Sequence, residues 1–521
     1  MNALELILVL LVVVAGLSVA AERLKVPYPM LLVVGGLALA FVPRLPAVRI
    51  DPELVLLVFL PPLLFAAAWF TSWRDFAANG RSIGLLAVGL VVATTTAVAW
   101  VAHAVIPGMS WPVAFVLGAI VSPPDAVAAT AVIQRLKVPR RIGTIIEGES
   151  LVNDATGLVA YKFALAAVAT GGFSVSSATG RFVIVAAGGV AVGLAVGWVA
   201  AQIHRRMENF EVETVITLLT PYAAYIPAEH LGVSGVLATV AAGGYLGWRN
   251  PELLSALTRF RGRGVWNVLL LLFNGLVFIL IGLQLAAIRE ISDTVSWREL
   301  LVYSAAVSAV TILVRLVYVP IGTYLPRLLS RRLRERDPYP PWENVALVAW
   351  TGMRGIVSLA LALALPMTLP QREAVVVVSF AVILVTLLLQ GLSLGWVIRA
   401  LGLTDDGADL REEREALIWA SRAALRRLEE IDNTSVLHPQ LVERVRLPYD
   451  ERLGRLTEEA REDPECRLTE GEGAAFRRLK GEALAAERKA VVELRNRGRI
   501  SEEVLHRVQE ALDIEALQPN R

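Results

Sequence analysis

The run EGESLVNDATG at residues 147–157 lies inside a stretch of membrane-spanning length that continues to about Ala169. It places carboxylates, a hydroxyl and an amide where a bilayer favours leucine. Inserting an ionisable side chain at that depth costs about 2.5–3.5 kcal/mol. Such residues are kept where a pathway or a partner requires them, so we expect the function of the chain to lie here.

The composition around this run is typical of a membrane protein. Hydrophobic residues make up 55% of the chain, and the mean hydropathy is +0.57, whereas soluble domains are roughly 45–50% apolar. Charged residues are sparse up to about Gly402 and dense from there to Arg521. We therefore predict an all-α polytopic membrane domain over residues 1–403 and a soluble helical C-terminal domain over residues 404–521, which is a dimerising appendage or a regulatory domain.

Apolar runs of about 17–25 residues are expected for membrane-spanning helices. We predict about thirteen, near residues 3–21, 27–42, 54–71, 82–104, 111–134, 142–169, 181–203, 212–228, 231–248, 265–288, 299–323, 343–366 and 373–400. The first is interpreted as a retained helix, because a signal peptide begins with a basic segment. Here the first basic residues, Arg23 and Lys25, follow the apolar run.

The charges in the connecting loops indicate the orientation. With the N-terminus outside, nineteen Lys and Arg residues fall in cytoplasmic loops, whereas the outside loops hold six: Arg44, Arg49, Arg181, Arg289, Arg298 and Arg372. Cytoplasmic loops of membrane proteins carry an excess of Lys and Arg. This bias predicts an odd number of spans and a cytoplasmic C-terminus.

Five residues of the opening run share one helical face, because Glu149, Ser150, Asn153, Asp154 and Gly157 are spaced i, i+1, i+4, i+5 and i+8. Carboxylate, hydroxyl and amide oxygens are the ligands that hard cations prefer. Gly157 permits close approach of a neighbouring helix. We predict a site for a monovalent cation and protons on this face; the alternative is a polar seam between helices.

The fifth span contains Ser122-Pro123-Pro124-Asp125. Two successive prolines interrupt a helix, because each lacks an N–H group and clashes with the preceding turn. We expect a second half-helix to begin here, capped by Ser122 or by the break itself, with its positive N-terminal end beside Asp125. The alternative is a simple proline kink.

The twelfth span contains Gly352-Met353-Arg354-Gly355, in which two glycines weaken the helix around an arginine. An arginine at this depth requires a partner. Glu149 is the predicted partner and Asp125 the alternative, which would leave Asp154 as the free acid. A purely structural arginine clamp remains an open interpretation.

The positions of the two predicted breaks favour an inverted repeat. Spans five and twelve are seven apart, so spans one to six and eight to thirteen would have opposite orientations. Interrupted helices at matching places in inverted halves are typical of secondary transporters. Four further polar residues are candidate modulators of the site: Lys162, Ser122, Ser358 and Arg315.

Other classes of function have less support. The single Cys466 forms no intramolecular disulfide, and no His-x-x-x-His pair indicates a metalloenzyme. An intramembrane aspartyl protease would also use two acids, here Asp125 and Asp154, but its Gly-x-Gly-Asp signature is absent. A cation channel and a sensor with a vestigial transport core are further alternatives. We expect a transporter rather than an enzyme, with no catalytic residue and no cofactor besides transported Na⁺ or K⁺ and H⁺.

Five pieces of the sequence resemble the cation:proton antiporter-1 family, the NhaP-type and NHE-like sodium/proton exchangers: Pro61–Trp69, Gly118–Val132, Glu147–Gly157, Thr220–Gly247 and Gly352–Pro366. They cover most of the membrane region in the right order. The resemblance is closest to a bacterial subgroup with a cytoplasmic tail, which implies a multi-pass protein of the bacterial plasma membrane.

The resemblance implies roles for individual residues. The family's ion-binding aspartate matches Asp154, the acid of the broken helix matches Asp125, and the ordering arginine matches Arg354. The glutamate, serine and asparagine beside the ion match Glu149, Ser150 and Asn153.

It also implies a homodimer with a moving core and, because Asn153 precedes Asp154, electroneutral exchange. One departure is Pro124, where many relatives have threonine, so Na⁺, K⁺ and Li⁺ stay open as the preferred ion.

Overall fold

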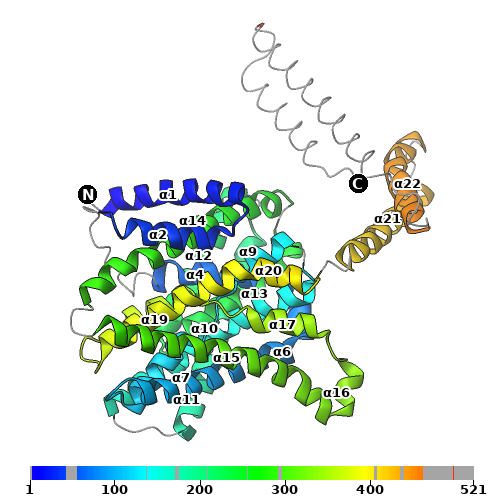
Figure 1. Cartoon of the computed structure of the whole chain (residues 1–521). Coiled ribbons are helices and arrows are strands. Elements are labelled where there is room, and N and C mark those ends of the chain that lie inside the picture. The colour runs from blue at the N-terminus through cyan, green and yellow to red at the C-terminus, as the bar shows by residue number, and fades with distance from the viewer. Residues whose placement is uncertain are drawn as a thin grey trace. The chain divides into compact units, whose positions relative to one another are not determined.

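The computed structural model describes residues 3–42, 56–136, 138–170, 175–207, 209–254, 256–291, 296–403, 408–434, 439–461 and 497. By its internal contacts the chain divides into two units, Met1–Asp405 and Asp406–Arg521. All regular structure in the described residues is helical (Figure 1). Arg44, Arg49 and Lys137, and the tail patterns around residues 474–494 and 502–517, lie outside the described residues.

The first half of the membrane unit contains the helix that carries the polar run, α10. Its elements are α1 (Ala3–Leu24), α2 (Tyr28–Leu39), α4 (Leu60–Phe70), α5 (Trp73–Ala78), α6 (Gly80–Gly84), η1 (Leu85–Leu90), α7 (Val91–Val105), α8 (Trp111–Val121), α9 (Ala126–Leu136), α10 (Arg140–Thr170) and α11 (Val175–His204).

The second half of this unit contains the Gly-Met-Arg-Gly sequence, between α17 and α18. Its elements are α12 (Phe210–His230), α13 (Gly235–Leu253), α14 (Ala256–Ile291), α15 (Trp297–Leu329), α16 (Arg331–Arg336), α17 (Trp342–Trp350), α18 (Ile356–Leu363), α19 (Arg372–Val385), η3 (Thr386–Gln390) and α20 (Gly391–Ala400).

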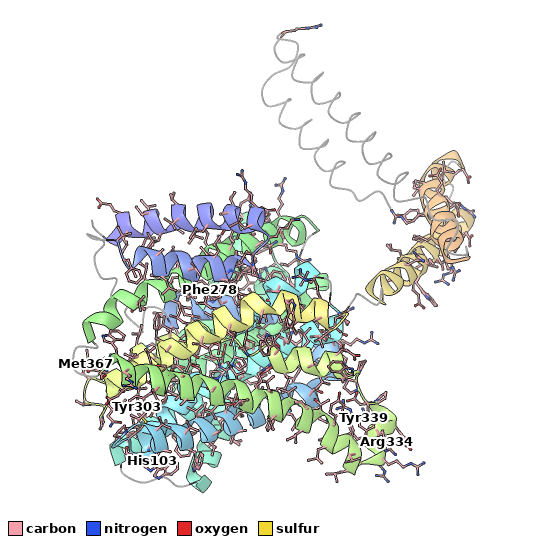
Figure 2. All side chains as sticks on the ribbon, viewed as in Figure 1. His103, Phe278, Tyr303, Arg334, Tyr339 and Met367 are labelled. Carbon is pink, nitrogen blue, oxygen red and sulfur yellow. The ribbon has the colours of Figure 1, made fainter. Side chains whose placement is uncertain are left out.

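Each of the thirteen predicted spans contains residues that the structure describes as helical. By length and composition, eight of the described helical segments are able to cross a membrane, and Tyr28–Leu39 and Leu56–Phe70 are shorter apolar helices. The count of thirteen therefore stays a prediction, whereas the polytopic all-helical class is evident. Figure 2 shows Met367 and Arg334 at opposite ends of the bundle. Met367 lies in the connection between α18 and α19, and Arg334 lies in the short helix α16.

Helix α10 occupies the interior of this unit. It packs against α8, α9, η1 and α6, and Asn153 on it has no exposed surface. Large apolar side chains such as Trp100, Leu301 and Trp396 lie exposed on the outer helices. Polar groups buried among apolar side chains, with an apolar exterior, are the arrangement that a bilayer favours, because polar groups find their partners within the protein.

The second unit, described by itself, contains α21 (Ala408–Thr434) and α22 (Pro439–Arg461), which pack against each other. Helix α21 includes the predicted helix over residues 411–431. Leu425 is buried, and Arg446 of α22 lies 3.8 Å from the Glu429 carboxylate of α21. The role of this domain stays a prediction.

Candidate functional site

The chain leaves the helical conformation at both predicted places. Residues 122–125 separate α8 from α9, and residues 351–355 separate α17 from α18. The two interruptions touch, since the Asp125 backbone N–H donates to the Met353 carbonyl at 2.7 Å. In an unbroken helix that N–H would bond to the carbonyl of Val121. The interruption at residues 351–355 therefore supplies the acceptor that the interruption at residues 122–125 lacks.

Two glycines allow this close contact. A Cβ atom added at Gly355 would overlap the carboxylate of Asp125. A Cβ at Gly157 would lie 2.9 Å from the ring of Pro123, so the segment that approaches Gly157 is the interruption between α8 and α9 rather than a neighbouring helix. Glycine at both positions therefore lets the interruption in the fifth span lie against α10 on one side and the second interruption on the other.

Asp125 and α10 together cap the start of α9. The Val127 N–H donates to Asp125 Oδ1 at 2.8 Å, and the Ala126 N–H donates to Ser150 Oγ at 3.3 Å. Side-chain acceptors at these first N–H groups are the usual stabilisers of a helix start. The Ser122 hydroxyl donates back to the Ala119 carbonyl at 3.3 Å, and the acceptors at the two N–H groups above are Ser150 and Asp125.

Asn153 ties α10 to the interruption itself. Its Nδ2 donates to the Pro124 carbonyl at 3.0 Å, while its Oδ1 is buried with no hydrogen-bond partner in the described structure. Pro124 has no side-chain hydroxyl, but its carbonyl accepts this hydrogen bond. Asn153 therefore positions the broken segment and leaves one amide oxygen unsatisfied.

A cavity of about 650 Å³ lies beside this contact, between α2, α4, α9, α10, α14 and α18. Its polar lining is Tyr28, Asp125, Thr130, Glu147, Ser150, Asp154, Arg263, Asn267, Asn274 and Ser358. Figure 2 labels Phe278, which belongs to the same wall. Asp154 is 8% exposed and, within the described residues, forms no hydrogen bond or ion pair. Its carboxylate is thus available to a small ligand in the cavity.

The prediction that Glu149 pairs with Arg354 is wrong. Glu149 pairs with Arg315 of α15, whose Nη1 and Nη2 donate to the two carboxylate oxygens at 2.5 and 2.7 Å. Both side chains are buried. A bidentate pair of this kind is the strongest geometry available to a guanidinium and a carboxylate, so Arg315 is part of the core and does not reach the interface.

Arg354 bonds to backbone rather than to an acid. Its Nε donates to the Val121 carbonyl at 2.8 Å, and its other nitrogens donate to the carbonyls of Ser122 and Gly352. The expected pairing with Glu149 or Asp125 is therefore not formed. The reason is that carbonyls at the end of α8 are freed by the break and carry the negative end of the helix dipole.

Arg315 has the matching role at the other interruption. Its Nε and Nη2 donate to the Val348 carbonyl at 3.2 and 3.1 Å, close to the end of α17. Each of the two half-helices that precede a break thus ends on a buried arginine: Arg354 for α8 and Arg315 for α17. Sequence reasoning missed this use of the arginines because it considered acids as partners and not freed carbonyls.

The remaining candidates have distinct surroundings. Lys162 forms an ion pair with Glu229 of α12 at 3.2 Å and is half exposed, so it does not pair with Asp154. Ser358 lines the cavity, and its buried hydroxyl has no partner in the described structure. Both lie on helices next to the site, and Ser358 alone of the two faces the cavity.

Asn267 and Asn274 are site residues that the motifs did not indicate. Both are amides in the apolar span near residues 265–288, and a spacing of seven places them on one helix face. That spacing was the available signal. For Thr386 the sequence gave no such signal. Its hydroxyl accepts a hydrogen bond from the Arg354 backbone N–H at 3.2 Å.

Comparisons with known proteins identify the family of the chain. A family model for the transmembrane sodium/hydrogen exchanger matches residues 8–400. An uncharacterized sodium/proton exchanger of Mycobacterium tuberculosis is 35% identical over 515 residues, which cover 97% of this chain and 94% of that protein. The sodium/proton antiporter ApNhaP of Aphanothece halophytica is 33% identical over 406 residues, which cover 78% of this chain and 75% of that protein.

A solved structure has the same fold. The sodium/proton antiporter MjNhaP1 from Methanocaldococcus jannaschii at pH 8 matches with a TM-score of 0.59 at 19% identity, covering 77% of this chain and 98% of that one. The family model covers most of the chain, and the polar run and both interruptions lie inside the matched region. The chain is therefore a multi-pass membrane protein that belongs to the transmembrane sodium/hydrogen exchanger family of cation:proton antiporters.

Proposed function

We propose that this protein exchanges Na⁺ for H⁺, one for one, by competition for Asp154. The observation that carries the proposal is the position of the Asp154 carboxylate, which lines the cavity with Ser150 and Asp125 beside the joined helix interruptions. Carboxylate and hydroxyl oxygens are the donors that hard cations prefer. The names of the relatives, sodium/proton exchanger and sodium/proton antiporter, support the same reaction.

Competition at one carboxylate couples the two fluxes. Asp154 holds either a proton or a cation, and in both cases the site is neutral. An empty, charged carboxylate is costly to move through a low-dielectric barrier, because burial of an unpaired charge is strongly unfavourable. Only the occupied site therefore crosses the barrier. A site that crosses with a cation bound returns with a proton bound, so the two fluxes are coupled.

Alternating access follows from movement of one bundle against another. We infer that a core bundle carrying spans five, six and twelve, and with them both interruptions, moves against the rest, within an inverted repeat of thirteen spans and a homodimer. The matching arginine caps on α8 and α17 support this symmetry. Rocking of one repeat around a fixed midplane site is the usual mechanism of such folds.

The residues that line the cavity support an inward-facing state. Its lining includes Thr130, Glu147 and Arg263, which lie toward the cytoplasm if the N-terminus is outside. We infer an inward-facing state in the plasma membrane of a bacterium, with the C-terminal domain in the cytoplasm. Arg263 packs over the ring of Phe70 at 5.5 Å in this wall.

Asn153 supports electroneutral exchange. With an amide at this position, Asp154 is the one exchanged charge on the face, and Glu149 is neutralised by Arg315. One cation then replaces one proton, so the membrane potential does no work on the cycle. An imposed potential that alone drove sustained exchange in proteoliposomes would refute this stoichiometry.

The decisive experiment uses Asp154→Asn in proteoliposomes that contain a pH-sensitive dye. Addition of Na⁺ should release protons with the unaltered protein and with the control Glu335→Gln, which changes an exposed carboxylate outside the cavity. The Asp154→Asn protein should fold and show no exchange above empty liposomes. Retained exchange would exclude Asp154 as the exchanged carboxylate.

K⁺ is the second candidate substrate, because Pro124 lacks the hydroxyl that many relatives place beside the site. The same assay with Na⁺, K⁺ and Li⁺ distinguishes the two. Half-maximal proton release at a lower concentration of K⁺ than of Na⁺ would make K⁺/H⁺ exchange the function, with the role of Asp154 unchanged.

A further inference from the structure

Glu147 is a carboxylate in the ion cavity that competition at Asp154 does not use. It belongs to α10 and lines the same cavity as Asp154. Its side chain is half-buried and, among the described residues, forms no hydrogen bond or ion pair. An ionisable side chain inside a membrane span is costly to keep without a partner or a pathway, so Glu147 calls for a role of its own.

The spacing on α10 connects Glu147 with Asp154. Ser150 lies between them, three residues after Glu147 and four before Asp154, and it also lines the cavity. Residues three or four apart on a helix are neighbours, with about 5–6 Å between their Cβ atoms. The helical rise separates Glu147 from Asp154 by roughly 10 Å along the axis. The three side chains therefore form a row of oxygen atoms that ends at Asp154.

Glu147 lies between the open end of the cavity and the buried carboxylate. Arg263 and Phe70, which line the cavity, are exposed. Glu147 is half-buried, and Asp154 is 8% exposed. Helix α10 begins at the exposed Arg140, about two turns before Glu147. An ion that enters from solvent therefore reaches Glu147 before it reaches Asp154.

The charges of the lining favour a cation. Asp125, Glu147 and Asp154 contribute three carboxylates, and Arg263 contributes one guanidinium. Asp125 already accepts from the Val127 N–H at 2.8 Å, whereas Glu147 and Asp154 have no partner in the described part of the chain. A recess with an excess of one sign of charge raises the local concentration of counter-ions by about 10–10³.

Arg263 is the positive charge nearest the open end of this lining, and it does not neutralise Glu147. It belongs to α14 and lies over the ring of Phe70 at 5.5 Å, an arrangement in which the face of the ring attracts the guanidinium. No ion pair joins Arg263 to Glu147 in the described structure. The carboxylate of Glu147 is thus accessible to a cation, whose binding Arg263 weakens by repulsion.

We propose that Glu147 is an entry site for the transported cation. The cation binds the Glu147 carboxylate, gives up part of its hydration shell to oxygen ligands of the protein, and passes the Ser150 hydroxyl on its way to Asp154. The inference rests on the proposed exchange at Asp154. Glu147 is not the exchanged carboxylate, so its charge sets how much cation is needed and not whether exchange takes place.

The test measures Na⁺-driven proton release in everted membrane vesicles, whose outer surface is the cytoplasmic face, from a host without sodium/proton exchange of its own. The Na⁺ concentration is varied at fixed pH. Glu147→Gln should raise the half-maximal Na⁺ concentration about fivefold or more and leave the maximal rate within about twofold, because it removes binding and not the exchange step. Glu147→Asp retains the charge and should retain the low half-maximal concentration. A purely structural role predicts the reverse order, since glutamine keeps the shape of glutamate.

Glu211→Gln is the control, because Glu211 is an exposed glutamate in the first turn of α12 and is not part of the cavity lining. Its half-maximal Na⁺ concentration should equal that of the unaltered protein. Arg263→Gln should lower this concentration, since it removes the positive charge that opposes cation entry. The decrease should be smaller in Glu147→Gln/Arg263→Gln, because two residues that act on one ligand are not additive.

Three results would overturn the entry site: an unchanged half-maximal concentration in Glu147→Gln, a milder effect of Glu147→Gln than of Glu147→Asp, or a lower maximal rate alone, which would assign Glu147 to proton transfer. If Glu147→Gln does not reach the membrane, Arg263→Gln decides, and no decrease there counts against the site.

Asp154→Asn in the same vesicles separates this inference from the proposed function. An inactive Asp154→Asn together with an unaltered Glu147→Gln refutes the entry site and leaves exchange at Asp154 standing. Exchange retained in Asp154→Asn refutes the proposed function, and the entry site with it.

Discussion

Arg315 and Glu149, 166 positions apart in the sequence, meet through two hydrogen bonds of 2.5 and 2.7 Å, and neither is exposed to solvent. Arg315 also donates to the Val348 carbonyl at the end of α17. The pair therefore joins the helix that carries Asp154 to one of the two interrupted helices.

Removing one member of this pair should be worse than removing both. Arg315→Gln leaves the Glu149 charge buried and should lower the free energy of unfolding by about 3–5 kcal/mol. The double variant Arg315→Gln/Glu149→Gln should recover a large part of this loss, measured by chemical or thermal unfolding in detergent. Strictly additive losses would show that the two side chains do not act as a pair. The control is Arg298→Gln, which replaces an exposed arginine.

Gly355→Ala should disrupt the contact between the interruptions. The added methyl group overlaps the Asp125 carboxylate, so Asp125 must move away from α9 and from the Met353 carbonyl. We expect cation-driven proton release to fall at least tenfold, about 1.4 kcal/mol in the rate-limiting barrier. Gly143→Ala is the control, because nothing lies within 4 Å of a Cβ there; equal rates in the two variants would contradict this account.

Pro124→Thr should change the choice of cation. Threonine adds a hydroxyl beside the Pro124 carbonyl that Asn153 contacts at 3.0 Å. An added oxygen ligand favours the smaller and more strongly hydrated Na⁺, so the half-maximal Na⁺ concentration should fall several-fold with little change for K⁺. Pro124→Val has the same shape without the hydroxyl and should not show the shift. A shift shared by both variants would attribute the effect to loss of the proline ring.

Asp337 should make stability depend on pH at the loop beside α16. Burial raises the pKa of this carboxyl, but hydrogen bonding and the charges of Arg141, Arg327 and Arg81 outweigh it, so the pKa lies below its usual value. A lowered pKa in the folded state stabilises the protein above the unfolded value of about 3.9. This contribution is lost as the pH falls through the folded pKa.

Asp337→Asn should therefore unfold at a lower temperature than the unaltered protein at pH 7. The difference should narrow as the pH falls below about 4, measured by scanning fluorimetry between pH 7 and the acid limit of the detergent-solubilised protein. Glu335→Gln, which removes an exposed pair with Arg331, should show a small difference throughout. A constant gap for Asp337→Asn across this range would contradict the assigned pKa direction.

The sequence by itself determined the class of fold and the location of the candidate site. Helices are local structures, and the bilayer requires apolar runs of a set length, so composition and spacing indicate them directly. Pro123 and Pro124 separate α8 from α9, because the proline ring and the missing N–H group do not allow one continuous helix. Glu149, Ser150, Asn153 and Asp154 share a face because the helical period places them there.

Tertiary structure decided which charges meet. Arg315 and Arg354 both lie in apolar stretches of sequence, and nothing in either local sequence distinguishes their partners. Packing placed Arg315 opposite Glu149 and Arg354 at the carbonyls that the end of α8 leaves free. It also paired Lys162 with Glu229 and, within the described residues, left the guanidinium nitrogens of Arg81 without a hydrogen-bond partner. Electrostatic partners depend on distances of a few ångströms between distant segments, and helical periodicity does not specify those distances.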